Sequence, residues 1–251
     1  MVTIESARAW YPVSDPVHGF DHVLRVYKLA DRLAQAEGAD LEIVRAAALL
    51  HDAEGGEGRV GSGQPSLPSQ SQVYDGTVNS EQLSVDNDRL SSIKNQQSSI
   101  NNDRLNHHLS SAEFAAQVLK AEGWDERRIA AVQHCIRAHR FRDNREAPHS
   151  LEAKILFDAD KLDAIGAVGV ARALGYALQA GQPAYARPSA QFLERGELAP
   201  GEPHSAYHEY LFKLRKIRER LYTASGRRLA EERHRSMAVF FERLAEEMEG
   251  E

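Results

Sequence analysis

Apolar residues recur along most of the chain with the period of an α-helix. The clearest segment is LEIVRAAALL at residues 41–50, where Ile43, Val44, Ala47 and Leu50 fall on one side of a helical surface. No run of alternating apolar and polar residues is long enough to predict a β-strand. The pattern therefore predicts an all-α domain.

Polar residues that accept hydrogen bonds from the free N–H groups of a first turn mark where several helices begin. In the first helix Pro16 would occupy the first turn, and Gly38 follows the end. The predicted helices, with the capping residue where the sequence offers one, are 16–34 (Asp15), 41–52 (Asp40), 113–123 (a capping box of Ser110 and Glu113), 126–139 (Asp125), 151–167 (Ser150), 208–223 and 226–247. A loop rich in Gly and Pro, at about 181–204, precedes the last two.

Residues 55–106 differ in composition from everything around them. Ser, Asn, Gln and Gly dominate this segment, and NDRL at 87–90 recurs at 102–105. The repeats form no continuous apolar seam, so a coiled coil is disfavoured. We expect a low-complexity, disordered insertion in a loop that tolerates it. The chain is then a single domain, residues 1–251, interrupted by this insertion.

Composition narrows the class of protein. The 31 Lys and Arg residues stand against 37 Asp and Glu residues, which disfavours general nucleic-acid binding. The single cysteine, Cys135, permits no internal disulfide and is predicted to be a small core residue. No apolar run approaches membrane-spanning length, and no basic-plus-apolar leader precedes the domain, so we expect a soluble, cytoplasmic protein. The amphipathic C-terminal helices are compatible with a homodimer.

Four polar residues are candidate metal ligands. His51 and Asp52 are adjacent at the end of an apolar helix, His22 lies upstream, and Asp160 lies downstream. Imidazole and carboxylate together suit Mn, Fe, Co, Ni or Zn, whereas all-oxygen sites suit Mg or Ca. Such an ion makes water a usable nucleophile near neutral pH and polarises a phosphoryl oxygen, which is what a phosphate hydrolase requires. The alternative for each histidine is a hydrogen-bonded core residue.

The chain resembles the HD-domain phosphohydrolase superfamily, and within it the branch called YedJ-like or YpgQ-like. The stretches that carry the resemblance are HGFDHVLRVYKLA, AALLHD, IRAHRF, ILFDADKLDAIGAVGVARALGYA and HEYLFKLRKIRERLYTASGRRLAEERHRSMAVFFERL. They extend from about residue 16 to 245, apart from the insertion. The resemblance implies a helical bundle with a metal site in its core, held by His22, His51, Asp52 and Asp160.

The last ligand has two neighbours of the same type. Asp158 and Asp163 flank Asp160, and in a helix Asp160 and Asp163 share one face. Spacing does not decide among the three, and Asp160 is assigned from the resemblance. Asp163 is then expected to orient a ligand or Lys161 as a hydrogen-bond acceptor.

Catalysis and phosphate binding need further groups. Asp52 is expected to orient or deprotonate the attacking water, and Glu54 to protonate the leaving group. Cations must hold the phosphate oxygens. The expected substrate-binding residues are Arg25, His139, Lys161 and Arg142, with Arg140 and Arg172 as further cationic candidates.

The resemblance implies hydrolysis of a nucleotide with one divalent transition metal, for which Mn is expected and Fe, Co, Ni, Zn and Mg are alternatives. Release of pyrophosphate from nucleoside or deoxynucleoside triphosphates is the leading activity, and a nucleotidase comes next. Two other classes remain open: a non-catalytic nucleotide-binding HD module, and a di-iron HD oxygenase. A second ion would need extra histidines, for which the candidates are His107 or His108 and His134 or His139.

Overall fold

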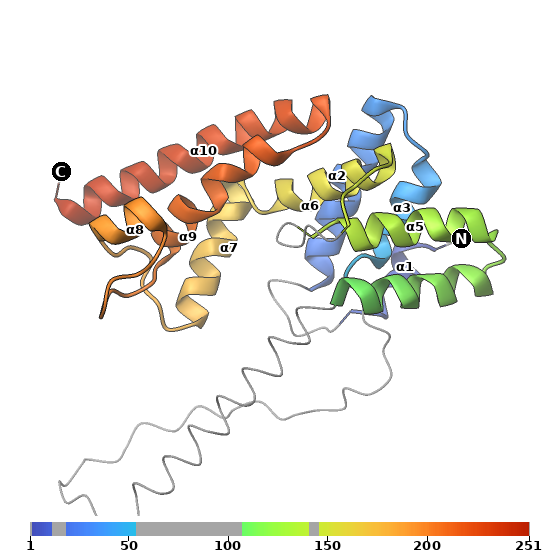
Figure 1. Cartoon of the computed structure of the whole chain (residues 1–251), viewed down its shortest axis with the longest axis horizontal. Coiled ribbons are helices and arrows are strands. Elements are labelled where there is room, and N and C mark those ends of the chain that lie inside the picture. The colour runs from blue at the N-terminus through green and yellow to red at the C-terminus, as the bar shows by residue number, and fades with distance from the viewer. Residues whose placement is uncertain (1, 12–18, 54–106, 141–145, 251) are drawn as a thin grey trace, which may run out of the picture.

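The computed structural model describes residues 2–11, 19–53, 107–140 and 146–250. Every regular element in these ranges is a helix, which confirms the predicted all-α fold (Figure 1). The predicted insertion at 55–106 lies outside the described residues. The elements are α1 (Ile4–Arg8), α2 (Phe20–Glu37), α3 (Leu41–Leu50), a helix over 107–121, α5 (Glu126–Ala138), α6 (Leu151–Asp163), α7 (Gly166–Gln179), α8 (Ala190–Arg195), α9 (Ala206–Phe212), the 3₁₀ helix η1 (Leu214–Arg220) and α10 (Ala224–Glu249).

The N-terminal half is a bundle in which α2, α3, α5 and α6 pack against one another (Figure 1). Its interior is apolar: Val23 and Val26 of α2, Leu50 of α3 and Ile155 of α6 are fully buried. Burial of such side chains stabilises each by about 1.5–3 kcal/mol relative to exposure. The bundle therefore supplies the dry surroundings in which the polar ends of α2, α3 and α6 meet.

Three predicted caps are confirmed, and two are wrong. Asp40, Asp125 and Ser150 each accept a hydrogen bond from an N–H of the turn they precede. α2 begins at Phe20 with Gly19 as its N-cap, so the helix start predicted after Asp15 is wrong, and Asp15 itself lies outside the described residues. Ser110 lies inside the helix over 107–121, and its hydroxyl donates to the carbonyl of residue 107, so it is not the N-cap of that helix.

The helix predicted over 151–167 is in fact two helices. α6 ends at Asp163, and α7 begins at Gly166 after a sharp turn. Gly166 has a φ of +78°, a left-handed conformation that costs glycine nothing and L side chains about 1–2 kcal/mol. The apolar periodicity continues through the turn, which is why the sequence pattern did not reveal it.

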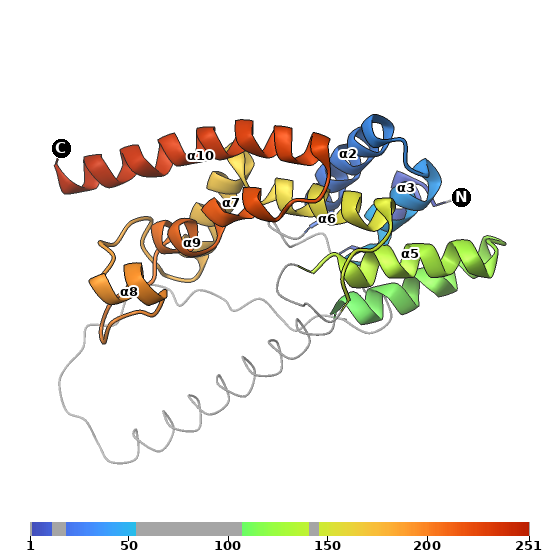
Figure 2. The same cartoon turned by 45° about the horizontal axis from the view of Figure 1, so that its top comes forward.

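The C-terminal half contains α7 to α10, and its longest element, α10, spans much of the molecule. α10 packs on α7, α9 and η1 and also contacts α2 and α6, so that it joins the two halves (Figure 2). The helix predicted over 208–223 is split into α9 and η1, although Leu214, Ile217 and Leu221 are buried as the pattern indicates. The loop predicted at 181–204 contains the short helix α8.

The structure also bears on Cys135 and on whether any helix could span a membrane. Cys135 is fully buried in the core of α5, as predicted, and burial raises the pKa of its thiol. Within the described ranges, no helix has the length and apolar character that crossing a bilayer would need.

Candidate metal centre

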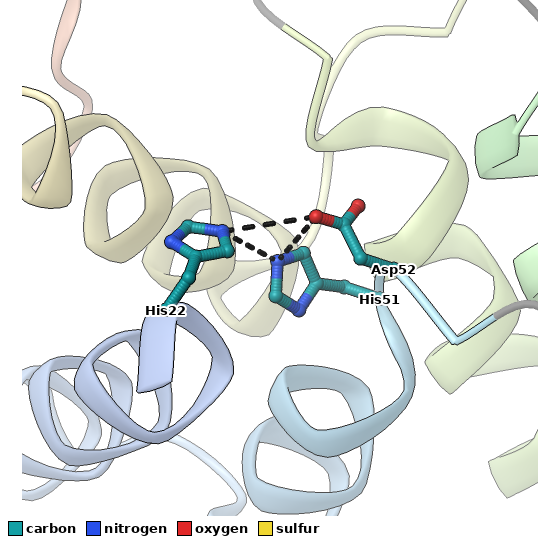
Figure 3. A group of neighbouring side chains, drawn as sticks. All are labelled: His22, His51 and Asp52. Carbon is teal, nitrogen blue, oxygen red and sulfur yellow. Dashed lines mark hydrogen bonds and ion pairs between the residues drawn. The ribbon is translucent and has the colours of Figure 1, made fainter. Parts of the chain in front are cut away.

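His51 and Asp52 stand where α3 ends, because Leu50 is the last residue of the helix and His51 is its C-cap. The His51 ring is fully buried, and its Nδ1 lies 2.9 Å from the carbonyl oxygen of Ala48. A carbonyl can only accept, so Nδ1 carries the proton and Nε2 presents a lone pair. That lone pair points toward Asp52 Oδ2, which is 3.5 Å away (Figure 3).

His22 approaches from the first turns of α2 and is also fixed in one tautomer. Its Nδ1 lies 2.7 Å from a carboxylate oxygen of Asp163, which is nearly fully buried. Burial acts to raise the pKa of Asp163, but hydrogen bonds from His22 and Arg25 hold it well below its usual value. The ionised carboxylate accepts a hydrogen bond from the N–H at Nδ1, so the proton stays on Nδ1 and His22 Nε2 is left as a lone-pair acceptor.

The acceptor atoms of this cluster face one another. His22 Nε2 lies 3.4 Å from His51 Nε2 and 3.7 Å from Asp52 Oδ2 (Figure 3). Lone pairs at these separations repel unless a proton or a cation lies between them. Two ligand atoms at about 2.1 Å from one ion are about 3.0–3.4 Å apart at octahedral or tetrahedral angles. The observed separations of 3.4, 3.5 and 3.7 Å are at or just above this range, so the three residues could hold a divalent ion with nitrogen and oxygen ligands after moving slightly closer together.

Asp160 lies beside this cluster, although it is not one of the three residues whose ligand atoms all lie close to one another. Its Oδ1 is 3.5 Å from His22 Nε2, whereas its Oδ2 is held by the ammonium of Lys161 at 2.5 Å. Burial acts to raise the pKa of Asp160, and Lys161 and His22 outweigh it and lower the pKa. The structure thus brings the assigned fourth ligand to the site, with Lys161 against it.

The other oxygen of Asp52 faces two further histidines. Asp52 Oδ1 is buried and lacks a hydrogen-bond partner among the described residues. His107 Nε2 lies 3.3 Å from it, and His139 Nε2 lies 3.6 Å from it. His139 Nδ1 faces the carbonyl of Ile136 at 2.5 Å, so His139 Nε2 is an acceptor as well. Burial lowers the pKa of His139 to about 3, which keeps the ring neutral at physiological pH.

Asp52 therefore lies between two groups of possible ligands, one with His22 and His51 and one with His107 and His139. Burial acts to raise its pKa, but the surrounding imidazoles hold the pKa well below its usual value. The other histidine candidates lie elsewhere. His134 binds Glu146 and stacks on His149, and His108 lies beside Arg140.

The predicted phosphate-binding residues are placed as follows. Arg25 donates through Nε and Nη2 to Asp163, and its side chain is 36% exposed. Glu54 and Arg142 lie outside the described residues. Arg172, a further cationic candidate, donates to Asp163 and lies 3.1 Å from His22 Nδ1.

One residue of the site gave no signal in the sequence. The hydroxyl of Tyr11 donates to the carbonyl of Leu49 at 2.9 Å, two residues before His51. Burial, reinforced by the charge of Asp52, raises the pKa of Tyr11 well above its usual value. Tyr11 and Leu49 are 38 residues apart, and no local pattern marks a contact at that distance.

Comparison with known proteins gives consistent similarities. Residues 19–165 match the HD domain family. The chain is 31% identical to the uncharacterised protein YpgQ of Bacillus subtilis over an alignment of 258 positions, which covers 98% of this chain and 94% of YpgQ. The crystal structure of B. subtilis YpgQ in complex with ADP superimposes with a TM-score of 0.61 at 25% identity, covering 99% of both chains. A predicted HD superfamily hydrolase from an uncultured Thermotogales bacterium gives 0.54 at 25% identity, covering 98% and 90%.

Proposed function

Because the chain belongs to the HD domain family and has the fold of HD-superfamily hydrolases, we propose that it is a metal-dependent phosphohydrolase that acts on nucleotides. The observation that carries the proposal is the convergence of acceptor atoms from His22, His51 and Asp52 in a buried site. The Nδ1 atoms of His22 and His51 each make a hydrogen bond to an oxygen that accepts it. The atoms of the three side chains that face the centre of the cluster are therefore lone-pair acceptors, and none of them is a hydrogen-bond donor.

His22, His51 and Asp52 would hold the ion, with Asp160 as the fourth ligand. When bound, a divalent ion supplies Lewis-acid chemistry, since it makes water a usable nucleophile near neutral pH and polarises a phosphoryl oxygen. Nitrogen and oxygen donors suit a transition metal, and Mn is the ion we propose.

The reaction is attack by water on phosphorus. The water oxygen forms a bond to phosphorus, and the bond to the leaving phosphate or pyrophosphate breaks with its electron pair on the departing oxygen. Asp52 Oδ1 would accept a hydrogen bond from the water and orient or deprotonate it, since this oxygen is buried and faces His107 and His139 rather than the ligand atoms of His22 and His51. The low pKa of Asp52 means that it is ionised and able to accept a hydrogen bond at neutral pH.

Nucleotides are proposed as substrates because the related YpgQ was crystallised with ADP. Within this class, release of pyrophosphate from nucleoside or deoxynucleoside triphosphates is the leading activity, with nucleotidase activity second. Arg25 and Lys161 would steady phosphate oxygens once substrate competes with the carboxylates that they bind in the structure.

The first experiment is a matrix of substrates and metals. Phosphate and pyrophosphate release would be measured from nucleoside mono-, di- and triphosphates with Mn, Co, Ni, Zn, Fe or Mg supplied. We expect turnover with a triphosphate and Mn, and its loss when EDTA removes the ion. Absence of turnover in every combination, together with tight nucleotide binding, would instead support a non-catalytic nucleotide-binding module.

A two-metal centre is the remaining alternative, because Asp52, His107 and His139 form a second group of ligand atoms. This group has only three potential metal ligands, and one of them, Asp52, also belongs to the group with His22 and His51. We therefore expect one ion per chain by elemental analysis, after loading with Mn or with Fe(II) under anaerobic conditions. We also expect His107→Ala to retain that ion. Two irons per chain that fall to one in His107→Ala, with an absorption change under oxygen, would favour a di-iron oxygenase.

A further inference from the structure

One cation reaches the metal centre from outside the segment that matches the HD domain family. Arg172 belongs to α7, whereas the match ends at residue 165. Its Nη1 donates to Asp163 Oδ2 and lies 3.1 Å from His22 Nδ1. We propose that Arg172 is a positioning residue, which fixes the Asp163 carboxylate and through it the orientation and tautomer of His22. This inference rests on the proposed metal site.

The Asp163 carboxylate is the link between Arg172 and the ligand. Only 1% of its side chain is exposed, and both of its oxygens accept hydrogen bonds. His22 Nδ1 and Arg172 Nη1 are both donors, so they share Oδ2 rather than bonding to each other. If the carboxylate rotated, the hydrogen bond to Nδ1 would be lost and His22 could carry its proton on Nε2. A protonated Nε2 cannot bind a metal ion.

Arg25 does not hold the carboxylate by itself. It comes from the same helix as His22, and it reaches Oδ1 at 2.7 Å but Oδ2 at the longer distance of 3.1 Å. Arg172 approaches from another helix and donates to Oδ2, which is the oxygen that His22 uses. The Arg172 side chain is also the more buried of the two, at 18% exposed against 36%. A charge-assisted hydrogen bond is strongest where water is excluded.

The turn between α6 and α7 explains why Arg172 can reach back. Gly166 adopts its left-handed conformation against Arg233 of α10, where a Cβ would lie 3.0 Å from that side chain. At Gly169 a Cβ would lie 2.3 Å from the carbonyl oxygen of Ala164, so only glycine permits this close approach. The turn brings Arg172 to Asp163, nine residues earlier. Packing of the C-terminal half is thereby coupled to a metal ligand.

The test measures metal affinity rather than activity. Apo-protein would be titrated calorimetrically with Mn(II) and with Co(II), whose absorption spectrum reports a change in ligands. We expect Arg172→Met to weaken binding about tenfold, Arg172→Lys to weaken it less, and Asp163→Asn to weaken it by about 10–100-fold. Because Arg172 acts through Asp163, the double variant should bind no more weakly than Asp163→Asn alone.

The matched control is Arg45→Met, which removes an arginine that binds Asp31 at 2.7 Å on the surface of the bundle. It should bind metal like the native chain. Circular dichroism would establish that each variant is folded. Native affinity in folded Arg172→Met, or additive losses in the double variant, would overturn the role of Arg172. A native chain that binds no ion would instead overturn the metal site on which the inference rests.

Discussion

Asp52→Asn should abolish metal-dependent hydrolysis, with a loss of at least about a thousandfold in kcat/KM. The Asp52 side chain has two proposed roles, as a metal ligand and as the group that acts on the attacking water. Its Oδ2 faces the lone pairs of His22 and His51, and its Oδ1 is the proposed proton acceptor. Asparagine has nearly the same shape but removes the negative charge and replaces one acceptor by a donor. Both the ligand set and the proton acceptor are therefore lost.

Thermal unfolding separates loss of metal from loss of fold. An ion that binds only the folded state stabilises it according to its concentration and affinity. The Tm of the native chain should therefore rise with added Mn, and that of Asp52→Asn should stay unchanged. Asp125→Asn is the matched control, because asparagine caps a helix about as well as aspartate and Asp125 caps α5 away from the site. Native turnover in Asp52→Asn would refute the proposed mechanism.

Asp158→Ala should destabilise the protein by about 3–5 kcal/mol, the largest loss of stability that we expect from one substitution. The carboxylate is fully buried in α6. It accepts hydrogen bonds from the backbone of Tyr222 and from the backbone and hydroxyl of Thr223, at 2.7–2.9 Å. Thr223 is the N-cap of α10. Alanine would leave these donors buried without a partner and would loosen the attachment of α10 to the bundle.

Urea denaturation would measure the loss, with Asp125→Ala as the comparison. That change removes an exposed N-cap, whose hydrogen bond to Arg128 is 3.0 Å long, and should cost only about 1 kcal/mol. The packing at Asp158 is close, since a Cβ on Gly226 would lie 2.5 Å from its Oδ2. An equal cost for the two variants would mean that Asp158 does not anchor α10.

Local signals in the sequence determined much of the helical framework. The helix after the Asp40 cap begins at residue 41 as predicted, because capping and apolar periodicity depend on neighbours a few residues away, and it ends at Leu50, two residues before the predicted end. The same local logic failed at the junction of α6 and α7. The apolar pattern continues there, but the chain turns at Gly166, which has a left-handed φ, and Gly169 leaves room for the carbonyl of Ala164. The sequence also selected His22, His51 and Asp52 as candidates, and these side chains do meet.

Only the tertiary structure separated the three carboxylates of α6. Asp158 binds the start of α10, and Asp160 lies beside His22 Nε2. Asp163 accepts a hydrogen bond from Nδ1 on the opposite side of the His22 ring. Successive residues turn by about 100° around a helix, so spacing places Asp158 apart from the other two without saying which side faces the histidines. That depends on how α2, α6 and α10 cross. The contact between His22 and Asp163 spans 141 residues, and helix packing at that range leaves no local pattern to read.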